Sequence, residues 1–153
     1  AGAAAAWSVP LVQVVAAAPA MAAVSGQAVL DITGTATWGA ANDNKPLQAA
    51  LRVTNTGGQS ATLLTVVLTF PAGYTPTARP NSLPTGWSAS GNGPSITFSA
   101  SGTVVASATT FSFSPVFDLA NANNRGKAVD VGLAVDAGGG ISDTGTLPVQ
   151  KSA

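Results

Sequence analysis

Residues 28–38 read AVLDITGTATW, and apolar side chains recur at every second position of this stretch. The apolar set is Ala28, Leu30, Ile32, Ala36 and Trp38. Asp31 and three threonines, at 33, 35 and 37, occupy alternate positions. A period of two places successive side chains on opposite faces of an extended chain. The stretch therefore predicts a β-strand with one face in a protein core and the other in water.

The same alternation returns along the chain, in segments separated by Gly, Pro, Asn and Ser. The further predicted strands are residues 47–54 (LQAALRVT), 62–70 (TLLTVVLTF), 87–90 (WSAS), 95–100 (SITFSA), 103–114 (TVVASATTFSFS), 128–137 (AVDVGLAVDA) and 147–150 (LPVQ). In residues 62–70, Leu64, Val66 and Leu68 share one face, and Leu63 and Val67 lie on the other. Because both faces are apolar, this strand is predicted to be central or covered on both sides.

Two longer segments are predicted to be irregular. Residues 71–86 contain four prolines, which cannot donate to a β-ladder. Residues 118–126 (DLANANNRG) are typical of a loop. No segment has the period of an amphipathic helix. We therefore expect an all-β chain with an immunoglobulin-like β-sandwich of about seven or eight strands over residues 24–153, preceded by an extended apolar segment, residues 1–23.

The composition excludes much catalytic chemistry. The 153 residues include no His and no Cys, all six acidic residues are Asp, and the formal net charge is zero. Ser-His-Asp triads, HExxH zinc sites and thiolate metal sites are therefore excluded. No spacing of the aspartates singles out a carboxylate pair. We expect a non-catalytic protein without a cofactor, and with no long-range attraction for nucleic acid.

Two groups of oxygen-bearing side chains have the composition of calcium ligands. The first is NDNK at residues 42–45, and the second is the set Asp118, Asn121 and Asn123. Neither matches a full calcium loop. Turn-forming and loop-capping roles are the favoured interpretation, because Asn and Asp side chains readily bond to nearby backbone groups.

Three aromatic residues have the chemistry to stack on a sugar ring. They are Trp38, Trp87 and Phe111. Their phase within the predicted strands indicates core positions first, and sugar binding second.

Residues 51–75 (LRVTNTGGQSATLLTVVLTFPAGYT) and 86–114 (GWSASGNGPSITFSASGTVVASATTFSFS) carry a resemblance. They resemble the immunoglobulin-like modules of bacterial cell-surface proteins, in which a strand ending in an Asn-x-Gly turn leads to a long strand closed by Pro-x-Gly. The resemblance implies a structural or adhesive role at the cell surface and transfers no active site.

Residues 6–26 (AWSVPLVQVVAAAPAMAAVSG) contain an apolar core and small-residue patterns at 18–20 and 20–22. This stretch is similar to the hydrophobic and cleavage regions of export signals on actinobacterial surface proteins, especially twin-arginine signals. The resemblance implies an extracellular, cell-surface protein exported by the twin-arginine route. The first positive charge in the sequence is Lys45, so no basic region precedes the apolar core.

Three interpretations of residues 1–23 are open. The segment is an uncleaved signal remnant, a helix in a filament core as in type IV pilins, or a β-strand. Pro10 and Pro19 argue against the helix, because a proline inside a helix removes a backbone hydrogen bond. As a strand, the segment would donate to a neighbouring subunit with Trp7, Val9, Leu11, Gln13 and Val15 on one face and Val12 and Val14 on the other. Pro10 removes one ladder hydrogen bond from such a strand.

The favoured prediction is a subunit of an extracellular filament or pilus that polymerises head-to-tail by N-terminal donor-strand complementation. In architecture the chain then resembles subunits of TasA-type biofilm fibres and archaeal bundling pili. Its partners would be identical subunits, with a surface glycan as a further candidate and no stable membrane span. Two alternatives remain: a monomeric cell-surface module that binds carbohydrate or protein and keeps a signal remnant, and a type IV pilin-like subunit.

Overall fold

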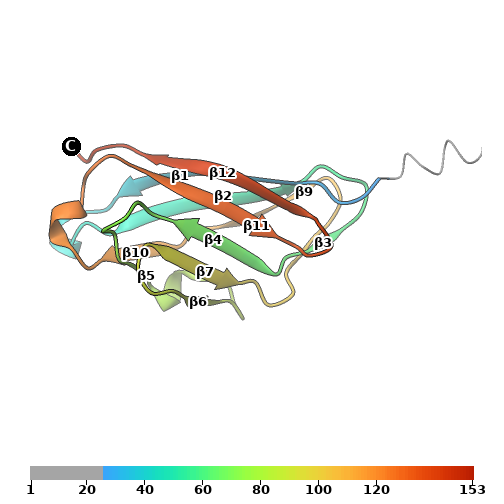
Figure 1. Cartoon of the computed structure of the whole chain (residues 1–153), viewed down its shortest axis with the longest axis horizontal. Helices are drawn as coiled ribbons and strands as arrows, with labels where there is room; N and C mark the ends of the chain where they lie inside the picture. Colours follow the sequence, from blue (N-terminus) through green and yellow to red (C-terminus); the bar gives the residue numbers. More distant parts are fainter. Residues whose placement is uncertain (1–25) are drawn as a thin grey trace, which may run out of the picture.

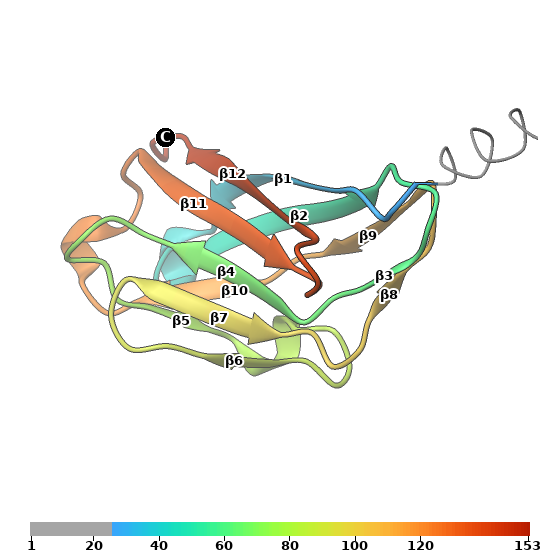
Figure 2. The same cartoon turned by 45° about the vertical axis from the view of Figure 1, so that its right-hand side comes forward.

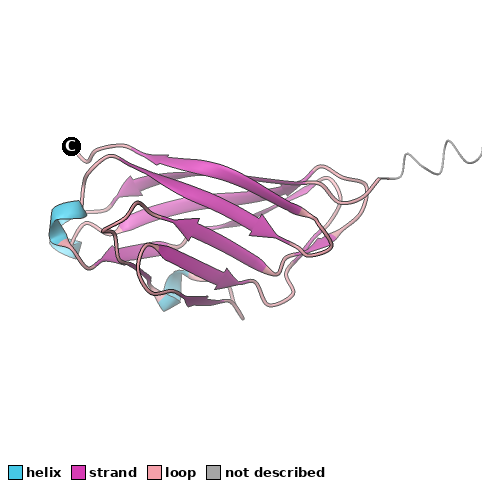
Figure 3. Cartoon of the chain, in the orientation of Figure 1, coloured by secondary structure: helices cyan, strands magenta, loops and turns pink. Residues whose placement is uncertain are grey.

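The computed structural model describes residues 26–153, which form an all-β unit (Figure 1). The predicted N-terminal segment, residues 1–23, and the predicted donor-strand residues 7–15 lie outside the described residues. Strands account for most of the regular structure, and three single 3-10 turns lie between them (Figure 3). These turns are Ala41–Asp43, Pro80–Ser82 and Ala122–Asn124.

Four strands are eight or nine residues long, and the first three of them follow alternating segments of the sequence. They are β1 (Leu30–Trp38), β2 (Leu47–Asn55), β11 (Val129–Asp136) and β12 (Ser142–Val149). The shorter strands are β3 (Ala61–Thr62), β4 (Thr65–Thr69), β5 (Pro76–Ala78), β6 (Ser88–Ser90), β7 (Ser95–Ser99), β8 (Val104–Val105), β9 (Thr109–Phe113) and β10 (Val116–Leu119).

One sheet contains ten of these strands. Its order is β5-β10-β2-β1-β12-β11-β4-β7-β6, and β9 pairs with β2 beyond β10. All pairings are antiparallel except that of β1 with β12, whose register joins Ala36 to Val149. Between β9 and β10 the ladder to β2 continues through a bond from Ala49 N to Pro115 O, 3.0 Å long. β9 and β10 thus form one interrupted strand, and β3 and β8 form a separate two-stranded ladder.

The ten-stranded sheet curls until it is nearly closed. In Figure 2, β11, β4 and β7 lie in front, and β2 and β10 lie behind them. β12 and β1 run along one long side, and β6 and β5, the two ends of the strand order, run along the other. The chain enters at one end of the long axis, and the C terminus lies at the opposite end (Figure 1).

The core lies between these two layers and is built from the apolar positions of the alternating strands. Its largest fully buried side chains are Phe98, Phe117, Leu47, Leu51, Leu63, Leu68 and Leu147. The phase predicted for β1 is confirmed, because Ala28, Leu30, Ile32 and Ala36 are buried and Trp38 packs against the core. Nearly all core residues are aliphatic or aromatic, so burial of apolar surface is the main source of stability.

The phase predicted for residues 62–70 is wrong at one point. Val66 and Leu68 are buried as expected, but Leu63 is buried and Leu64 is 52% exposed. The reason is that the chain leaves β3 at Thr62 and enters β4 at Thr65. This break shifts the inward phase by one residue, so the second face is not covered at Leu64. The prediction that the strand is central is confirmed, because β4 lies between β11 and β7.

The strand boundaries differ from the sequence prediction in four further places. The predicted strand 103–114 is divided into β8 and β9, which residues 106–108 separate. β5 lies inside residues 71–86, which were predicted to be irregular, and β10 ends within the predicted loop 118–126. β12 begins at Ser142, five residues before the predicted 147–150. Twelve strands are described instead of seven or eight because several are two- or three-residue pieces and one long strand is interrupted. The all-β class itself is confirmed.

Candidate functional site

The N-terminal root, defined here as residues 27–29, is held at the end of the molecule where the chain enters. Thr56 N donates to Val29 O at 2.9 Å, and Val29 N donates to Asn55 Oδ1 at 3.2 Å. Ala28 is buried in the core. The root is therefore fixed by both backbone and side-chain contacts, just before β1 begins.

Asn55 is the centre of this arrangement and is fully buried. Its Oδ1 also accepts a bond from Gly57 N at 3.0 Å. Its Nδ2 donates to Gln59 O at 2.7 Å and to Val105 O at 3.0 Å. The side chain thus makes four hydrogen bonds, two accepted and two donated, which is the full capacity of an amide. One residue ties together the root, the turn after β2 and strand β8.

From the sequence alone, Asn55 is recognised only as the first residue of an Asn-x-Gly turn. Its bond to Gly57 is the local one that such a turn predicts. The bonds to Val29 and Val105 join residues 26 and 50 positions away along the chain. No local sequence signal reports them.

Apolar side chains are exposed around the same end of the molecule. Val29, Leu64 and Val104 are 54%, 52% and 59% exposed. Val29 belongs to the root, Val104 lies in β8, and Leu64 follows β3; both strands lie near the end where the chain enters (Figure 2). We call the root together with these side chains the entry pole.

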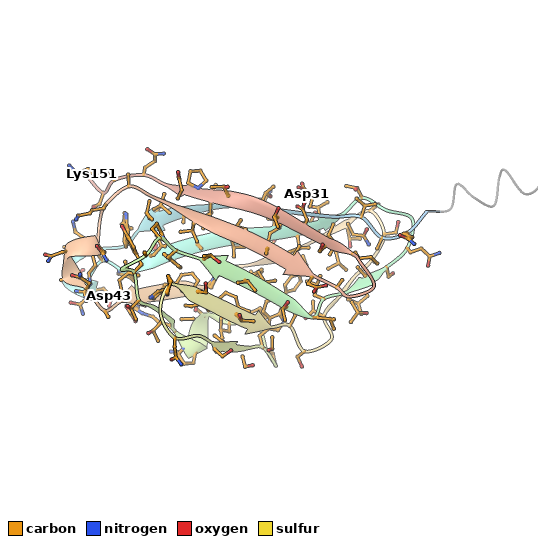
Figure 4. The ribbon with its side chains drawn as sticks, in the orientation of Figure 1. Asp31, Asp43 and Lys151 are labelled. Carbon is orange, nitrogen blue, oxygen red and sulfur yellow. The ribbon has the colours of Figure 1, made fainter. Side chains whose placement is uncertain are left out.

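The two loops with the composition of calcium ligands are brought together by Arg79. Its guanidinium donates to both carboxylate oxygens of Asp118, at 3.0 and 2.8 Å. It also donates to both oxygens of Asp43, at 3.0 and 3.2 Å. Figure 4 labels Asp43 and Lys151 toward the end of the molecule opposite the entry pole. An arginine cation occupies the position between the acidic groups, so the contacts are those of an ion-paired loop junction.

The capping role predicted for these loops is confirmed at Asn121. Its side chain accepts a bond from Asn123 N at 2.9 Å and caps the 3-10 turn that follows. Within residues 26–153, no three Asp side chains gather as a metal-binding group.

Hydrogen bonding by Arg79 lowers the pKa of Asp118, with smaller contributions from the charges of Arg79 and Arg125; partial burial acts in the opposite direction. A lowered folded-state pKa gives stability that is present above the ordinary value of 3.8 and is lost as the pH falls through the folded value. We expect Asp118→Asn to lower Tm by about 2 °C at pH 7. The difference should shrink between pH 4 and pH 2 in thermal unfolding followed by circular dichroism. An unchanged difference at pH 2 would contradict this account.

The aromatic residues lie against the core, as their phase predicted. Trp87 is buried, and its ring stacks on Phe111 at 5.5 Å between centroids. Phe111 and Trp38 are partly buried and pack against the core, and Trp38 Nε1 donates to Lys127 O at 2.9 Å. None of the three stands free on the surface as a sugar-stacking platform.

Comparisons with known proteins bear on the fold of this chain and assign no activity to it. No family model and no curated protein matches the chain. A DUF4466 family protein from Parabacteroides merdae is similar in structure, with a TM-score of 0.53 and 14% identity over 84% of this chain and 46% of that chain. At this identity the likeness concerns the fold alone.

Two glycoside hydrolases show weaker similarity. A GH20 exo-β-N-acetylglucosaminidase from Vibrio harveyi has a TM-score of 0.44 and 11% identity, over 84% of this chain and 19% of the enzyme. A GH18 chitinase from Chromobacterium violaceum has a TM-score of 0.43 and 11% identity, over 82% of this chain and 20% of the enzyme. The chain therefore spans less than half of the DUF4466 protein and about one fifth of each enzyme.

None of the helical turns within residues 26–153 is long and apolar enough to cross a membrane.

Proposed function

We propose that this protein is a structural subunit of an extracellular filament, which polymerises head-to-tail when residues 7–15 of one copy add a strand to the next. The entry pole is the observation that carries the proposal. The apolar, uncharged segment is joined to the domain at a root that Asn55 holds in place. This root lies at one end of the long axis, and the C terminus lies at the other (Figure 1).

A contact made by a protruding segment at one place and an acceptor surface at another is heterologous, and such contacts propagate into fibres. Exposed Val29, Leu64 and Val104 at the entry pole provide apolar surface that a neighbouring subunit would cover. Strand addition would supply main-chain hydrogen bonds, while alternate apolar side chains would supply specificity. The low charge of the chain limits repulsion between stacked copies.

We infer that the domain is an immunoglobulin-like sandwich. Its first strand pairs antiparallel with β2 and parallel with β12, so it belongs to both layers. Strands distant in sequence are neighbours, as β2 with β10 and β4 with β11, which is the arrangement of a Greek key. This inference accords with the resemblance to modules of bacterial surface proteins and with an extracellular location.

Electron microscopy and light scattering of the full chain test the filament proposal. We expect filaments from the full chain and from Ala3→Asp, which places a charge outside the predicted donor strand. We expect monomers from a chain lacking residues 1–23 and from Leu11→Asp, because a buried carboxylate without a partner opposes strand insertion.

Two outcomes would overturn the proposal. Filaments from the truncated chain would exclude the donor strand, and a monomeric full chain would favour the monomeric binding module. N-terminal sequencing of the protein recovered from cells provides an independent check. A terminus near Val24 would mean that residues 1–23 are a discarded signal.

A further inference from the structure

We propose that the acceptor for the donated strand is the seam between β5 and β6, and that residues 7–15 of a second copy fill it. The seam is defined by residues 76–78 of β5 and residues 89–91 at the end of β6, with Ile96 of β7 beneath them. This inference rests on the filament function proposed above, and it adds the surface that receives the strand.

The backbone of β5 has unpaired groups directed into the seam. Arg79 N donates to Val116 O, and Ala120 N donates to Thr75 O. Odd-numbered residues of this segment therefore face β10. Because neighbouring residues of an antiparallel strand direct their backbone groups to opposite sides, the N–H and C=O of Ala78 face the seam, together with the C=O of Pro76, which has no N–H.

The backbone of β6 also directs unpaired groups into the seam, from the side opposite β5. Phe70 N donates to Pro94 O, so even-numbered residues of the β7 segment face β4. The odd-numbered residues of β7 face β6, where their partners are Ser88 and Ser90. Ala89 therefore directs its N–H and C=O away from β7 and into the seam. Each side of the seam offers both donors and acceptors to an added strand.

The seam is open down to the core. A pocket of about 140 Å³ lies between the two strands, lined by Pro76, Thr77, Ala78, Ala89, Ser90, Gly91 and Ile96. Ala89 pairs with Phe98, whose side chain is fully buried, so Ala89 lies on the inner face of the sheet. Ala89 is nevertheless exposed. An inner-face residue is exposed here because no strand covers the gap beside it.

The volume of the pocket and its uncharged lining fit one apolar side chain of an added strand. A cavity of about 150 Å³ holds a benzene-sized group, so one aliphatic side chain fits in the pocket. None of the residues that line the pocket is charged, and residues 7–15 carry no charge either. Val9 and Leu11 lie on the same face of the predicted donor strand, and we assign one of these two side chains to the pocket.

The position of the seam favours a donor from another copy. The strand order places β1 between β2 and β12, and β5 and β6 at the two ends. Figures 1 and 2 show β1 and β12 along one long side and the seam along the other. The described part of the chain thus begins beside β1, on the side away from its own seam, and a head-to-tail neighbour can receive the donated strand.

One other strand of the ten-stranded sheet has a single neighbour within residues 26–153. This strand is β9, which pairs only with β2. None of the residues that line the pocket next to the end of β9 belongs to β9 itself, so that pocket would not receive a strand added along β9. β9 is therefore the matched alternative edge for the experiment.

The absence of Cys from the sequence permits a direct cross-linking test. Ala89→Cys is combined, in one chain, with Cys in place of Val9, Leu11 or Gln13 in turn. We expect at least one pair to give a ladder of covalent multimers after mild oxidation of filaments, seen on a denaturing gel. The matched control replaces Ala89→Cys with Thr109→Cys, an exposed position of β9 on the inward phase of that strand, and we expect no ladder.

The outcomes separate this inference from the proposed function. Filaments that give ladders only through β9 would overturn the seam and leave the filament function standing. Cross-links confined to monomers would show that each chain fills its own seam and would overturn the second-copy donor. A full chain without filaments would overturn the filament function itself.

A proline variant gives a second, independent readout. Ala89→Pro removes the N–H that faces the seam and leaves the β6–β7 pairing intact. We expect it to weaken filament growth about tenfold, the factor that corresponds to about one lost hydrogen bond. Ala89→Ser keeps the N–H and should match the wild type. Equal growth of all three proteins would contradict the seam.

Discussion

Asn55→Ala is expected to destabilise the protein by about 3–5 kcal/mol and to lower Tm by about 10 °C. Urea unfolding monitored by Trp fluorescence measures the change. Asn55 is fully buried and makes four hydrogen bonds. Alanine would leave Val29 N, Gly57 N, Gln59 O and Val105 O without that partner, and would also open a cavity. An unpaired buried polar group is more unfavourable than a hydrogen bond is favourable.

Asn55→Asp tests the acceptor and donor roles of this side chain separately. The Oδ1 acceptor for Val29 N and Gly57 N is retained, but a carboxylate would face the carbonyl oxygens of Gln59 and Val105. Burial and these oxygens would raise its pKa above the unfolded value, so the variant should gain stability relative to the wild type as the pH falls. At pH 7 we expect a loss at least as large as for alanine.

Thr54→Ala is the control from the neighbouring position. Its hydroxyl makes an exposed contact with Thr110 Oγ1 at 2.9 Å. We expect a change within about 0.5 kcal/mol. If Asn55→Ala were no more harmful than Thr54→Ala, the bonds from Asn55 would contribute nothing beyond what water supplies.

The fold could be predicted from sequence where the chain alternates regularly. In β1 and β11 the apolar positions fall on one face, and both strands lie where the pattern placed them. The prediction failed where pairing depends on distant segments. β5 contains Pro76, and nothing local shows that Phe117, Asp118 and Leu119 are its partners. Proline is tolerated there because β5 is an edge strand.

The ion pairs of Arg79 with Asp43 and Asp118 could not be predicted from the sequence either. Asp43 and Asp118 stand in separate loops, and each is most simply explained as a turn residue. Arg79 joins them only because β5 pairs with β10 and so places Arg79 beside Asp118. The seam could not be predicted for the same reason, because it depends on long-range strand pairing. It forms only when the sheet curls and brings its two end strands, β5 and β6, near each other.

Gly57→Ala is expected to cost about 3 kcal/mol or more, because an added methyl group would meet backbone on three sides. An ideal Cβ at Gly57 would lie 2.5 Å from Val29 N and 2.7 Å from Ala28 Cα, and closer still to Gln27 O. Backbone atoms cannot rotate away as a flexible side chain can. Either the turn after β2 or the root must move, and each movement disturbs bonds made by Asn55.

Gly132→Ala is the matched control, since its Cβ would meet only Thr69, at 3.7 Å, which is ordinary contact. We expect Gly132→Ala to be neutral or slightly stabilising, because alanine restricts the unfolded chain. In Gly57→Ala, amide exchange should accelerate first at Val29 if the root moves, and at Gly57 itself if the turn moves. Displacement of the root would also misdirect the segment that precedes it. Filament growth should then fall even at temperatures where the domain stays folded. A stable Gly57→Ala protein with wild-type exchange at Val29 would contradict the packing of the turn against the root.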